Sequence, residues 1–380
     1  MKIANTNAIN YTINELINIR EINAALEDAF TRPLNLDSII INSVDLKNKM
    51  AEFQDRYNEL RGDKASQGEL ALTIVVSQLL QNAGLSDGII PGDVTNEIIA
   101  QGRIFREGEM EANLFYQATQ PLGEHTVGAF TLATGKYEAY QLLHYNSALI
   151  LENGVNIPRL AMFDHDFIYP CILENGEAWM TVTPNEIFTI ERSVRDAQGK
   201  VLTLGLGLGY FAYMAAMKDD VSRVTVIERQ AEVIELFEKF IRPLLECGDK
   251  ITVIQGDAIK YMEELEDGEY DYCFADIWMG NTDTDQYLAL REVCSRFRKT
   301  RLSYWIEDSL VSSLMGYVTL VIVEEGCRNR GIPLPDEDNL TDEGRAKLAF
   351  VRSLLENESA DRPDQLMWYA DYRNIMHLLG

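Results

Sequence analysis

Hydrophobic residues at the start of the chain recur with the period of a helix. Ile13, Leu16 and Ile17 are followed by Leu26, and the positions between them include acidic residues and amides. Intervals of three and four residues place such side chains on one face of an α-helix. Strand signals are sparse before residue 147, so the sequence predicts a helical domain over residues 1–146.

The apolar pattern changes to a period of two after this region. Two Asn-Gly pairs, Asn153-Gly154 and Asn175-Gly176, each separate two apolar-rich runs. Asn-Gly accepts the positive φ angles of a tight hairpin turn, so two β-hairpins are predicted. Thr183-Pro184 then supplies an N-cap and a proline at the first helical position, which predicts a helix to about Asp196. Residues 147–199 are therefore expected to form a β-hairpin lead-in and a linking helix.

Short apolar strands alternate with helices in the following part of the chain. Such alternation, with strands that are apolar at nearly every position, is typical of a parallel sheet covered by helices on both faces. We therefore predict an α/β fold with a Rossmann-like doubly wound sheet over residues 200–332. Further helices are expected in residues 333–380. The predicted strands are Val201–Leu204, Arg223–Ile227, Ile251–Ile254, Tyr270–Ala275 and Leu302–Ile306.

The composition of the chain indicates the cellular compartment that is expected for this protein. The longest apolar stretch, Leu310 to Val323, is shorter than the roughly 18 residues that a membrane helix needs, and the N-terminal segment lacks a signal-peptide core. The five cysteines contain no Cys-x-x-Cys pair. We therefore expect a cytoplasmic protein with reduced thiols, without a metal site and without membrane contact.

The charge of the chain is strongly negative. Lys and Arg number 34 against 60 Asp and Glu, which gives a formal net charge of -26. Nucleic-acid binding depends largely on basic side chains that neutralise phosphates, so it is not expected here. A small or cationic substrate suits this charge better. The oligomeric state stays open, a homo-oligomer included.

The run from Val201 to Tyr210 carries the clearest chemical signal. A predicted buried strand ends there in Gly205-Leu206-Gly207-Leu208-Gly209. Glycines let the backbone bend sharply and leave room for a ligand at the N-terminus of the following helix. Gly207, Gly209 and Ala212 also satisfy the dinucleotide fingerprint, so nicotinamide or flavin binding is an alternative.

Three acids end the strands that follow the glycines. Glu228 ends the second strand, about 20 residues past the glycines, where a carboxylate can accept hydrogen bonds from ribose hydroxyls. Asp257, followed by Ala258, ends the third strand, and Asp276 ends the fourth. Three carboxylates at one sheet edge attract a cationic sulfonium nucleoside and repel a pyrophosphate.

With these residues the sequence resembles the class I S-adenosylmethionine-dependent methyltransferases, and within them the spermidine synthase branch. The resemblance covers residues 173–307 and is carried by the glycine segment and by the three strand ends with their acids. It implies that the glycines approach the amino-acid part of the cofactor, that Glu228 binds its ribose, and that Asp257 and Ala258 bind its adenine.

Several positions depart from the spermidine synthase pattern. Aminopropyltransferases carry an acid inside the glycine loop, where this chain has Leu208, and a second aspartate after the strand-four acid, where it has Met279. Their Tyr-His-Glu motif is echoed only by Thr189-Ile190-Glu191. By the resemblance, the missing residues would hold and deprotonate a diamine, so the sequence favours a methyltransferase over a polyamine synthase.

The sequence therefore predicts methyl transfer from S-adenosylmethionine to a small acceptor, with amines as a candidate class. Such a displacement depends mainly on holding the nucleophile and the methyl group near contact distance. Asp276 is expected to orient or deprotonate the acceptor. Tyr210 is expected to contact the cofactor, and core packing is its alternative. Three further aromatic residues are expected to wall the substrate pocket, and core packing is again the alternative. They are Tyr169, Trp179 and Trp278.

Three other functions remain open from the sequence. An aminopropyltransferase would use decarboxylated S-adenosylmethionine in the same nucleoside pocket. A nicotinamide oxidoreductase would use the glycine fingerprint for a dinucleotide. A non-catalytic module would bind the nucleoside without turnover.

Overall fold

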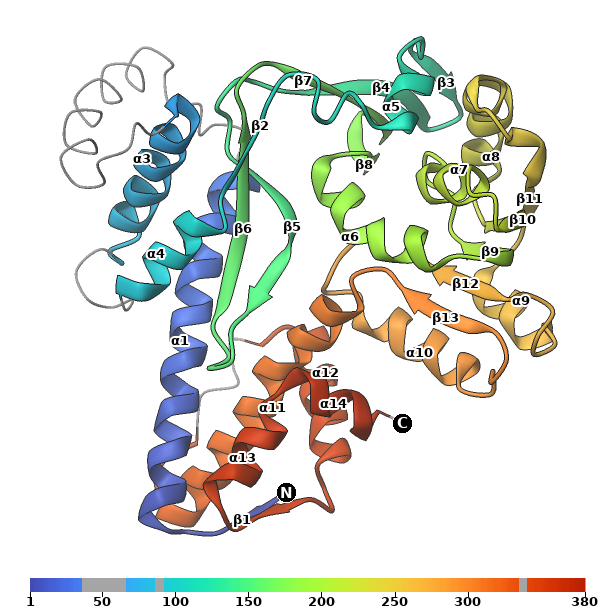
Figure 1. Ribbon diagram of the computed structural model, residues 1–380. Helices are drawn as coiled ribbons and strands as arrows, with labels where there is room; N and C mark the ends of the chain where they lie inside the picture. Colours follow the sequence, from blue (N-terminus) through green and yellow to red (C-terminus); the bar gives the residue numbers. More distant parts are fainter. Residues whose placement is uncertain (36–65, 86–91, 335–339, 380) are drawn as a thin grey trace.

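The part of the chain beyond Gly199 is built on five parallel strands (Figure 1). The structure, a computed structural model, describes residues 1–35, 66–85, 92–334 and 340–379. The strand order is β11-β10-β9-β12-β13, and every neighbouring pair is parallel. The strands are β9 (Gly199–Leu204), β10 (Val221–Glu228), β11 (Ile251–Gln255), β12 (Tyr272–Ala275) and β13 (Arg301–Tyr304). The predicted α/β fold is confirmed.

Apolar strands at the centre of this sheet make it the core of the α/β part. Val201, Leu202 and Leu204 of β9 are completely buried, and all four residues of β12 are buried. Such strands are stable only when helices cover both sheet faces. Four helices separate the strands along the chain, namely α7 (Tyr210–Ala216), α8 (Ala231–Leu236), α9 (Ala258–Glu264) and α10 (Thr284–Cys294).

The strand order creates a switch point between β9 and β12. The chain moves from β9 outward through β10 to β11, and then crosses to the other side of β9 to form β12. In open α/β sheets, ligands bind outside the carboxyl ends of the strands at such a reversal. A ligand is therefore expected to bind at the loops that follow β9 and β12.

Two smaller sheets precede the parallel sheet. One is antiparallel and has the order β3-β4-β7-β8, and the other has the order β2-β6-β5. Both predicted hairpins are confirmed, because Asn153-Gly154 joins β5 to β6 and Asn175-Gly176 joins β7 to β8. The strands are β2 (Arg103–Phe105), β3 (His125–Val127), β4 (Phe130–Tyr137), β5 (Leu143–Ile150), β6 (Asn156–Phe163), β7 (Phe167–Glu174) and β8 (Glu177–Thr181).

The prediction of an all-helical segment over residues 1–146 is wrong in its second half. That segment contains β2, β3, β4 and the start of β5. β4 pairs along its whole length with β7, from Phe130 opposite Glu174 to Tyr137 opposite Phe167. Only Phe130 and Leu132 of β4 are fully buried, so its own sequence gives a weak period-two signal. Pairing with a distant strand, rather than local preference, forms this strand.

Helices pack at both ends of the chain and meet one another. α1 (Asn7–Asn35) lies beside α11 (Glu307–Arg330), and β1 (Lys2–Ile3) pairs with β14 (Ser359–Ala360) (Figure 1). The predicted C-terminal helices are present, with the second divided into two. The remaining helices are α3 (Gln67–Asn82), α4 (Gly92–Ala100), α5 (Leu114–Thr119), α6 (Pro184–Asp196), α12 (Asp342–Leu354), α13 (Pro363–Tyr369) and α14 (Tyr372–Leu378).

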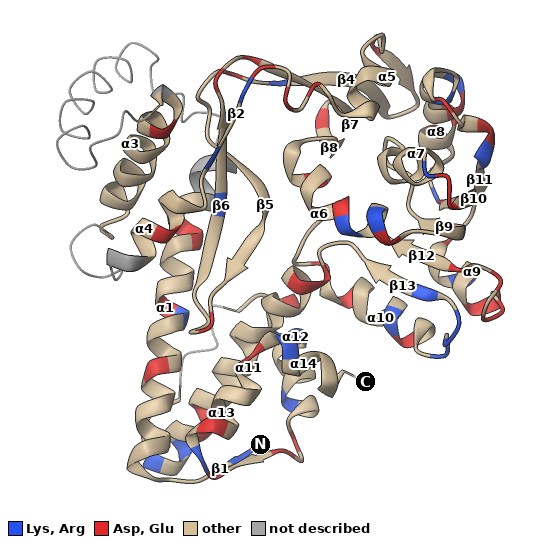
Figure 2. Ribbon diagram, in the orientation of Figure 1, with Lys and Arg blue, Asp and Glu red and all other residues tan. Residues whose placement is uncertain are grey.

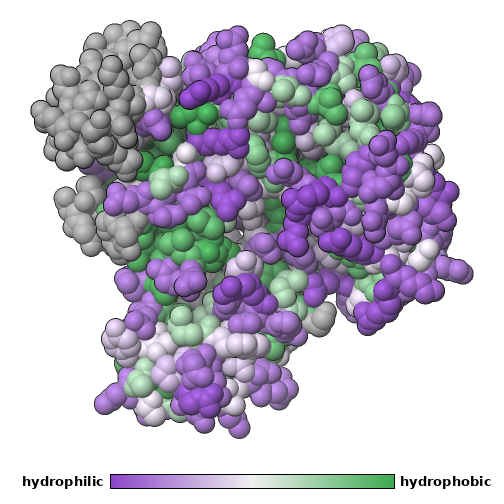
Figure 3. Space-filling view, in the orientation of Figure 1, coloured by the Kyte–Doolittle hydropathy of each residue, from purple (hydrophilic) through white to green (hydrophobic). Residues whose placement is uncertain are grey.

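A second hydrophobic core joins the N-terminal helices to the β2-β6-β5 sheet. It includes Phe30 of α1, Val75 of α3 and Ile98 of α4, which pack with Leu160 of β6. Figure 3 shows an apolar area on this side of the molecule, next to the grey residues that are not described. Figure 2 shows acidic positions spread over the helical and the α/β parts. The negative charge therefore extends over the whole fold.

The apolar stretch near Leu310 belongs to a longer helix than the sequence suggested. α11 has 24 residues and is long and apolar enough to cross a membrane by length and composition alone. However, 67% of its most apolar window is buried inside the protein. The core helix of a globular fold passes the same length test, so this is weak evidence for a membrane span.

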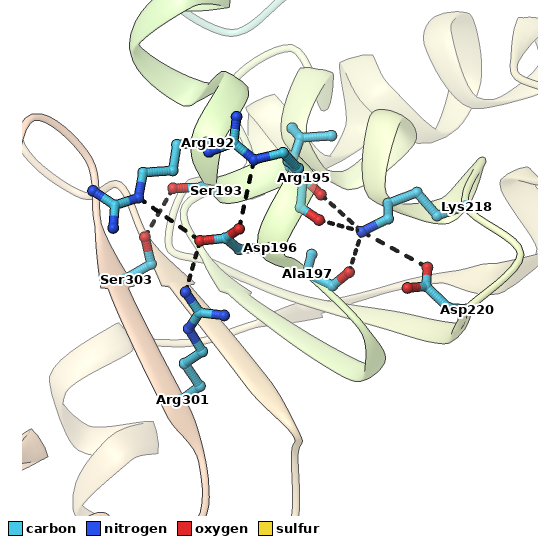
Figure 4. A network of polar contacts seen from close by, with 10 residues as sticks. Arg192, Ser193, Arg195, Asp196, Ala197, Lys218, Asp220, Arg301 and Ser303 are labelled. Atoms are coloured by element: carbon cyan, nitrogen blue, oxygen red, sulfur yellow. Dashed lines mark hydrogen bonds and ion pairs between the residues drawn. The ribbon is translucent and has the colours of Figure 1, made fainter.

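The amino-terminal edge of the parallel sheet is closed by polar contacts (Figure 4). Lys218 donates hydrogen bonds to the carbonyl oxygens of Val194, Arg195 and Ala197, at the end of α6. A cation at a helix C-terminus satisfies unpaired carbonyl groups and the helix dipole. Asp196 pairs with Arg301 of β13 at 2.7 Å. These contacts join α6 to both flanks of the sheet at the edge opposite the switch point.

Candidate functional site

The loop between β9 and α7 lies directly against the end of β12. Gly205 has a φ of 95°, and a Cβ atom at this position would lie 2.0 Å from the carbonyl oxygen of Asp276. A side chain therefore cannot be accommodated without moving the backbone. Leu206 and Leu208 of the same loop point into the core, with 7% and 0% of their surface exposed. The loop thus brings bare backbone to the switch point.

Among the three glycines of this loop, Gly207 has the most space for a Cβ atom, and that space is bounded by the neighbouring antiparallel sheet. Its φ is 51°, and a Cβ atom would lie 3.1 Å from the side chain of Met180 in β8. The β7-β8 hairpin therefore covers the loop from the other side. Gly209 also has a positive φ, of 82°, and starts α7. The predicted glycine motif is present as a strand-to-helix turn.

Glu228 ends β10 and holds the glycine loop. It is 7% exposed, and its Oε2 atom accepts a hydrogen bond from the backbone N–H of Leu206 at 3.0 Å. Its Oε1 atom accepts from the N–H of Gln230 at 2.8 Å. Each carboxylate oxygen has a second lone pair, so Glu228 can still accept from a ligand hydroxyl.

Asp257 and Ala258 lie at the end of the next strand. Asp257 is exposed and is the N-cap of α9, where its Oδ1 atom accepts from the N–H of Lys260 at 3.0 Å. Ala258 is the first residue of that helix. Within the described ranges, no hydrogen bond is made by the Oδ2 atom of Asp257. The capping role therefore leaves one oxygen for a ligand.

Asp276 ends β12 at the centre of the switch point. Its main-chain N–H donates to Leu204, and its carbonyl packs on Gly205. Its carboxylate makes no hydrogen bond or ion pair to any described residue. Loss of solvation raises its pKa to about 8, and the nearby charge of Glu186 adds to the shift. A carboxylate that gives up its proton near neutral pH is suited to accept one from a substrate.

Glu186 is a second acid at this site that the sequence did not single out. It lies in the first turn of α6, and its Oε2 atom accepts a hydrogen bond from the hydroxyl of Thr183 at 2.5 Å. Burial raises its pKa, while hydrogen bonding to Thr183 and Thr181 opposes that shift. From the sequence it is only an acid in the first turn of a predicted helix. Its proximity to Asp276 depends on tertiary structure alone.

Two tyrosines of the antiparallel sheet lie near Glu186. Tyr137 of β4 and Tyr169 of β7 have ring centroids 5.0 Å apart, and Gly135 leaves the space that the Tyr169 ring fills. Burial raises the pKa of both hydroxyls, and Glu186 contributes to each shift. Both tyrosines are thus neutral at physiological pH. Neutral phenol rings next to a carboxylate can contact a cation without adding charge.

Three other aromatic residues predicted at the site have packing partners. Tyr210 is 5% exposed, packs edge-on against Phe115 and accepts a hydrogen bond from Asn113. Trp278 is 4% exposed and donates to the carbonyl of Trp305. Both side chains are thus packed in the interior, and their contact with a ligand stays a prediction. Trp179 of β8 is partly exposed and packs edge-on on a phenylalanine of β4, so its role as a pocket wall stays a prediction.

Known proteins give weak matches to this chain. No family model matches. A polyamine aminopropyltransferase of Prochlorococcus marinus subsp. pastoris is 23% identical over 140 residues, which cover 34% of this chain and 49% of that protein. The match thus spans about half the length of that relative. Similarity to the spermidine synthase branch is supported at this level.

Solved spermidine synthase structures also match part of the chain. The enzyme of Thermotoga maritima is 15% identical and covers 39% of this chain and 54% of its own, with a TM-score of 0.28. A spermidine synthase in complex with the transition-state analogue AdoDATO is 16% identical and covers 42% and 55%, with a TM-score of 0.28. Scores this low carry no argument, so the fold assignment rests on the strand order described above.

Proposed function

We propose that this protein transfers an aminopropyl group from decarboxylated S-adenosylmethionine to an amine acceptor. The observation that carries the proposal is Asp276, whose carboxylate has no hydrogen-bond or ion-pair partner among the described residues and is set against a bare glycine loop at the switch point. A positively charged donor and an acceptor amine would both relieve its unfavourable environment. The similarity to a polyamine aminopropyltransferase supports the same reaction class.

The charge of the site favours the decarboxylated donor over S-adenosylmethionine itself. Glu228 and Asp276 contact the loop, Asp257 ends the strand beside β10, and Glu186 lies near Asp276. None of these four acids forms an ion pair with a Lys or Arg in the described part of the chain. The decarboxylated donor carries a sulfonium and an ammonium, whereas S-adenosylmethionine adds a carboxylate that these acids would repel. The methyltransferase prediction therefore becomes the second candidate.

The reaction would be an in-line displacement at the carbon next to sulfur. The acceptor nitrogen forms a bond to that carbon, the carbon–sulfur bond breaks, and its electron pair stays on sulfur, which leaves as methylthioadenosine. Asp276 would take the proton that the nitrogen loses. Glu228 and the loop would hold the nucleoside so that nitrogen and carbon meet at contact distance. Tyr137 and Tyr169 would flank the cationic substrate.

Product analysis tests the proposal against its alternatives. The protein is incubated with either donor and with a panel of monoamines, diamines and triamines, and the products are measured by mass spectrometry. We expect an aminopropylated amine and methylthioadenosine from the decarboxylated donor. A methylated amine and S-adenosylhomocysteine would support the second candidate instead. Donor binding without turnover across the panel would indicate a binding module, and binding of a nicotinamide dinucleotide would refute both transfer reactions.

A further inference from the structure

The glycine loop contains no acid that could hold an ammonium group of the donor. Its two non-glycine residues, Leu206 and Leu208, are buried. An ammonium next to the loop therefore needs an acid from another element. Removing an ammonium from water without an ionic partner is strongly unfavourable.

Glu186 is an acid on the element that follows the strand covering this loop, and it lies close enough to Asp276 to raise the pKa of that carboxylate. Met180 of β8 covers Gly207, and its neighbour Thr181 hydrogen-bonds toward Glu186 at the start of α6. The hydroxyl of Thr183 donates a hydrogen bond to the carboxylate of Glu186 at 2.5 Å. No Lys or Arg among the described residues pairs with Glu186, although it is half-buried. Its carboxylate is thus held in position without a cationic partner among those residues.

We infer that Glu186 binds the ammonium group of the donor and selects decarboxylated S-adenosylmethionine against S-adenosylmethionine. This inference rests on the proposed function and adds the residue that determines donor choice. Asp276 would then remain available for the acceptor. The division of work follows from position, because Glu186 follows the strand whose Met180 covers Gly207, whereas the backbone of Asp276 contacts Gly205.

A capping role is the alternative explanation for Glu186. A glutamate at the third helical position often hydrogen-bonds back to the N-cap residue. Such a role predicts loss of stability on substitution and equal effects on every nucleoside. Donor selection predicts an effect that depends on the ammonium and the carboxylate of the ligand. The two explanations are therefore separable by comparing ligands.

The experiment measures calorimetric affinities of three ligands for the wild-type protein, Glu186→Gln and Glu177→Gln. The ligands are decarboxylated S-adenosylmethionine, S-adenosylmethionine and methylthioadenosine, which lacks the aminopropyl group. Gln keeps the size and the hydrogen bond with Thr183. Glu177 is exposed on β8 and serves as the matched control. Thermal unfolding of each variant reports the capping contribution.

The inference predicts a specific pattern of affinities. Wild-type protein should bind the decarboxylated donor more tightly than S-adenosylmethionine, and Glu186→Gln should lose about 10- to 100-fold of that affinity, the usual range for a charged hydrogen bond. Methylthioadenosine should bind both proteins equally. Equal losses for all three ligands, or an unchanged affinity for the decarboxylated donor, would overturn the role. If no ligand binds wild-type protein, the proposed function itself fails.

Discussion

The two halves of the carboxyl edge of the sheet treat their acids in opposite ways. In the nucleoside half, Glu228 and Asp257 accept hydrogen bonds from backbone N–H groups of the loop and of α9. In the half proposed to be reactive, the carboxylate of Asp276 has no such donor among the described residues, and burial raises the pKa of Asp276 and of Glu186. The first pair of acids is thus held by hydrogen bonds without a ligand. The second pair would be stabilised by a bound cation.

From this difference we expect Glu228 and Asp257 to bind the nucleoside, and Asp276 and Glu186 to bind the groups that react. Carboxylates that are held by backbone groups keep their shape and can accept further hydrogen bonds from ribose and adenine, at little reorganisation cost. A desolvated carboxylate has a raised pKa, and that of Asp276, at about 8, suits proton transfer near neutral pH. The comparison therefore makes distinct predictions for substitutions in the two halves.

The largest effect is expected for Asp276→Asn. This substitution keeps the shape of the side chain and removes its ability to accept a proton. Turnover with a saturating amine should fall by about 10²- to 10⁴-fold, the usual contribution of a positioned base, while donor affinity stays within a few-fold. Stopped assays of methylthioadenosine release and donor calorimetry measure the two quantities. Comparable losses in both would assign Asp276 to the nucleoside half.

The pH dependence of the wild-type enzyme sharpens this prediction. Since the pKa of Asp276 is raised to about 8, its carboxylate takes up a proton as the pH falls below that value. The kcat/KM for the amine should therefore decrease toward acidic pH. The Asn variant should lack this dependence on Asp276.

Substitution of Gly207 by Val is expected to lower the affinity for the donor by more than about 100-fold. The β-branched side chain would displace Met180 and fill the surface along which the donor lies. Calorimetry measures the loss, and circular dichroism checks the fold. Gly205→Ala is the contrasting variant, because its Cβ meets backbone at 2.0 Å and should destabilise the protein itself. Retained binding in Gly207→Val would show that the loop is only a turn.

Much of the nucleoside half was predictable because its signals are local. The strand, the glycines and Glu228 follow one another in the sequence, and each has a known structural preference. β4 was missed because its pairing with β7 determines it. Glu186 was recognised only as a first-turn acid, and its position near Asp276 follows from how α6 packs. Trp278 and Tyr210 are adjacent to the site in sequence, but their side chains point into the core.

Glu228→Ala should weaken donor binding by about 1.5 to 3 kcal/mol, the range for a hydrogen bond to a charged group. The structure adds a second effect, since the N–H of Leu206 would lose its acceptor. Glu228→Gln separates the two, because an amide oxygen can still hold Leu206. Calorimetry of methylthioadenosine binding is the measurement, as that ligand tests the nucleoside half alone. Unchanged affinity in both variants would remove Glu228 from the site.

Stability should also depend on pH through Asp276. Its pKa is 3.8 in the unfolded chain and about 8 in the fold, so between these values the folded protein holds a proton that the unfolded chain releases. Stability therefore falls as the pH rises through this window. Because part of the residue is accessible to water, we expect Asp276→Asn to raise the free energy of unfolding by about 1 to 3 kcal/mol at pH 8. Denaturation at pH 5 should give a smaller difference, and a larger one would refute the shift.

The smallest effect is expected at the opposite edge of the sheet, for Asp196→Asn. Asp196 pairs with Arg301 at 2.7 Å, and the side chain of that arginine is 57% exposed. Exposed ion pairs contribute about 0.2 to 1 kcal/mol, and Asp196 also ends α6, where a negative charge is unfavourable to the helix dipole. Chemical denaturation should therefore detect a loss within that range, and donor affinity should not change. A loss of donor affinity would mean that the two edges of the sheet are coupled through α6, which carries Glu186 in its first turn and ends at Asp196. The contrast between the halves of the carboxyl edge would then extend along this helix.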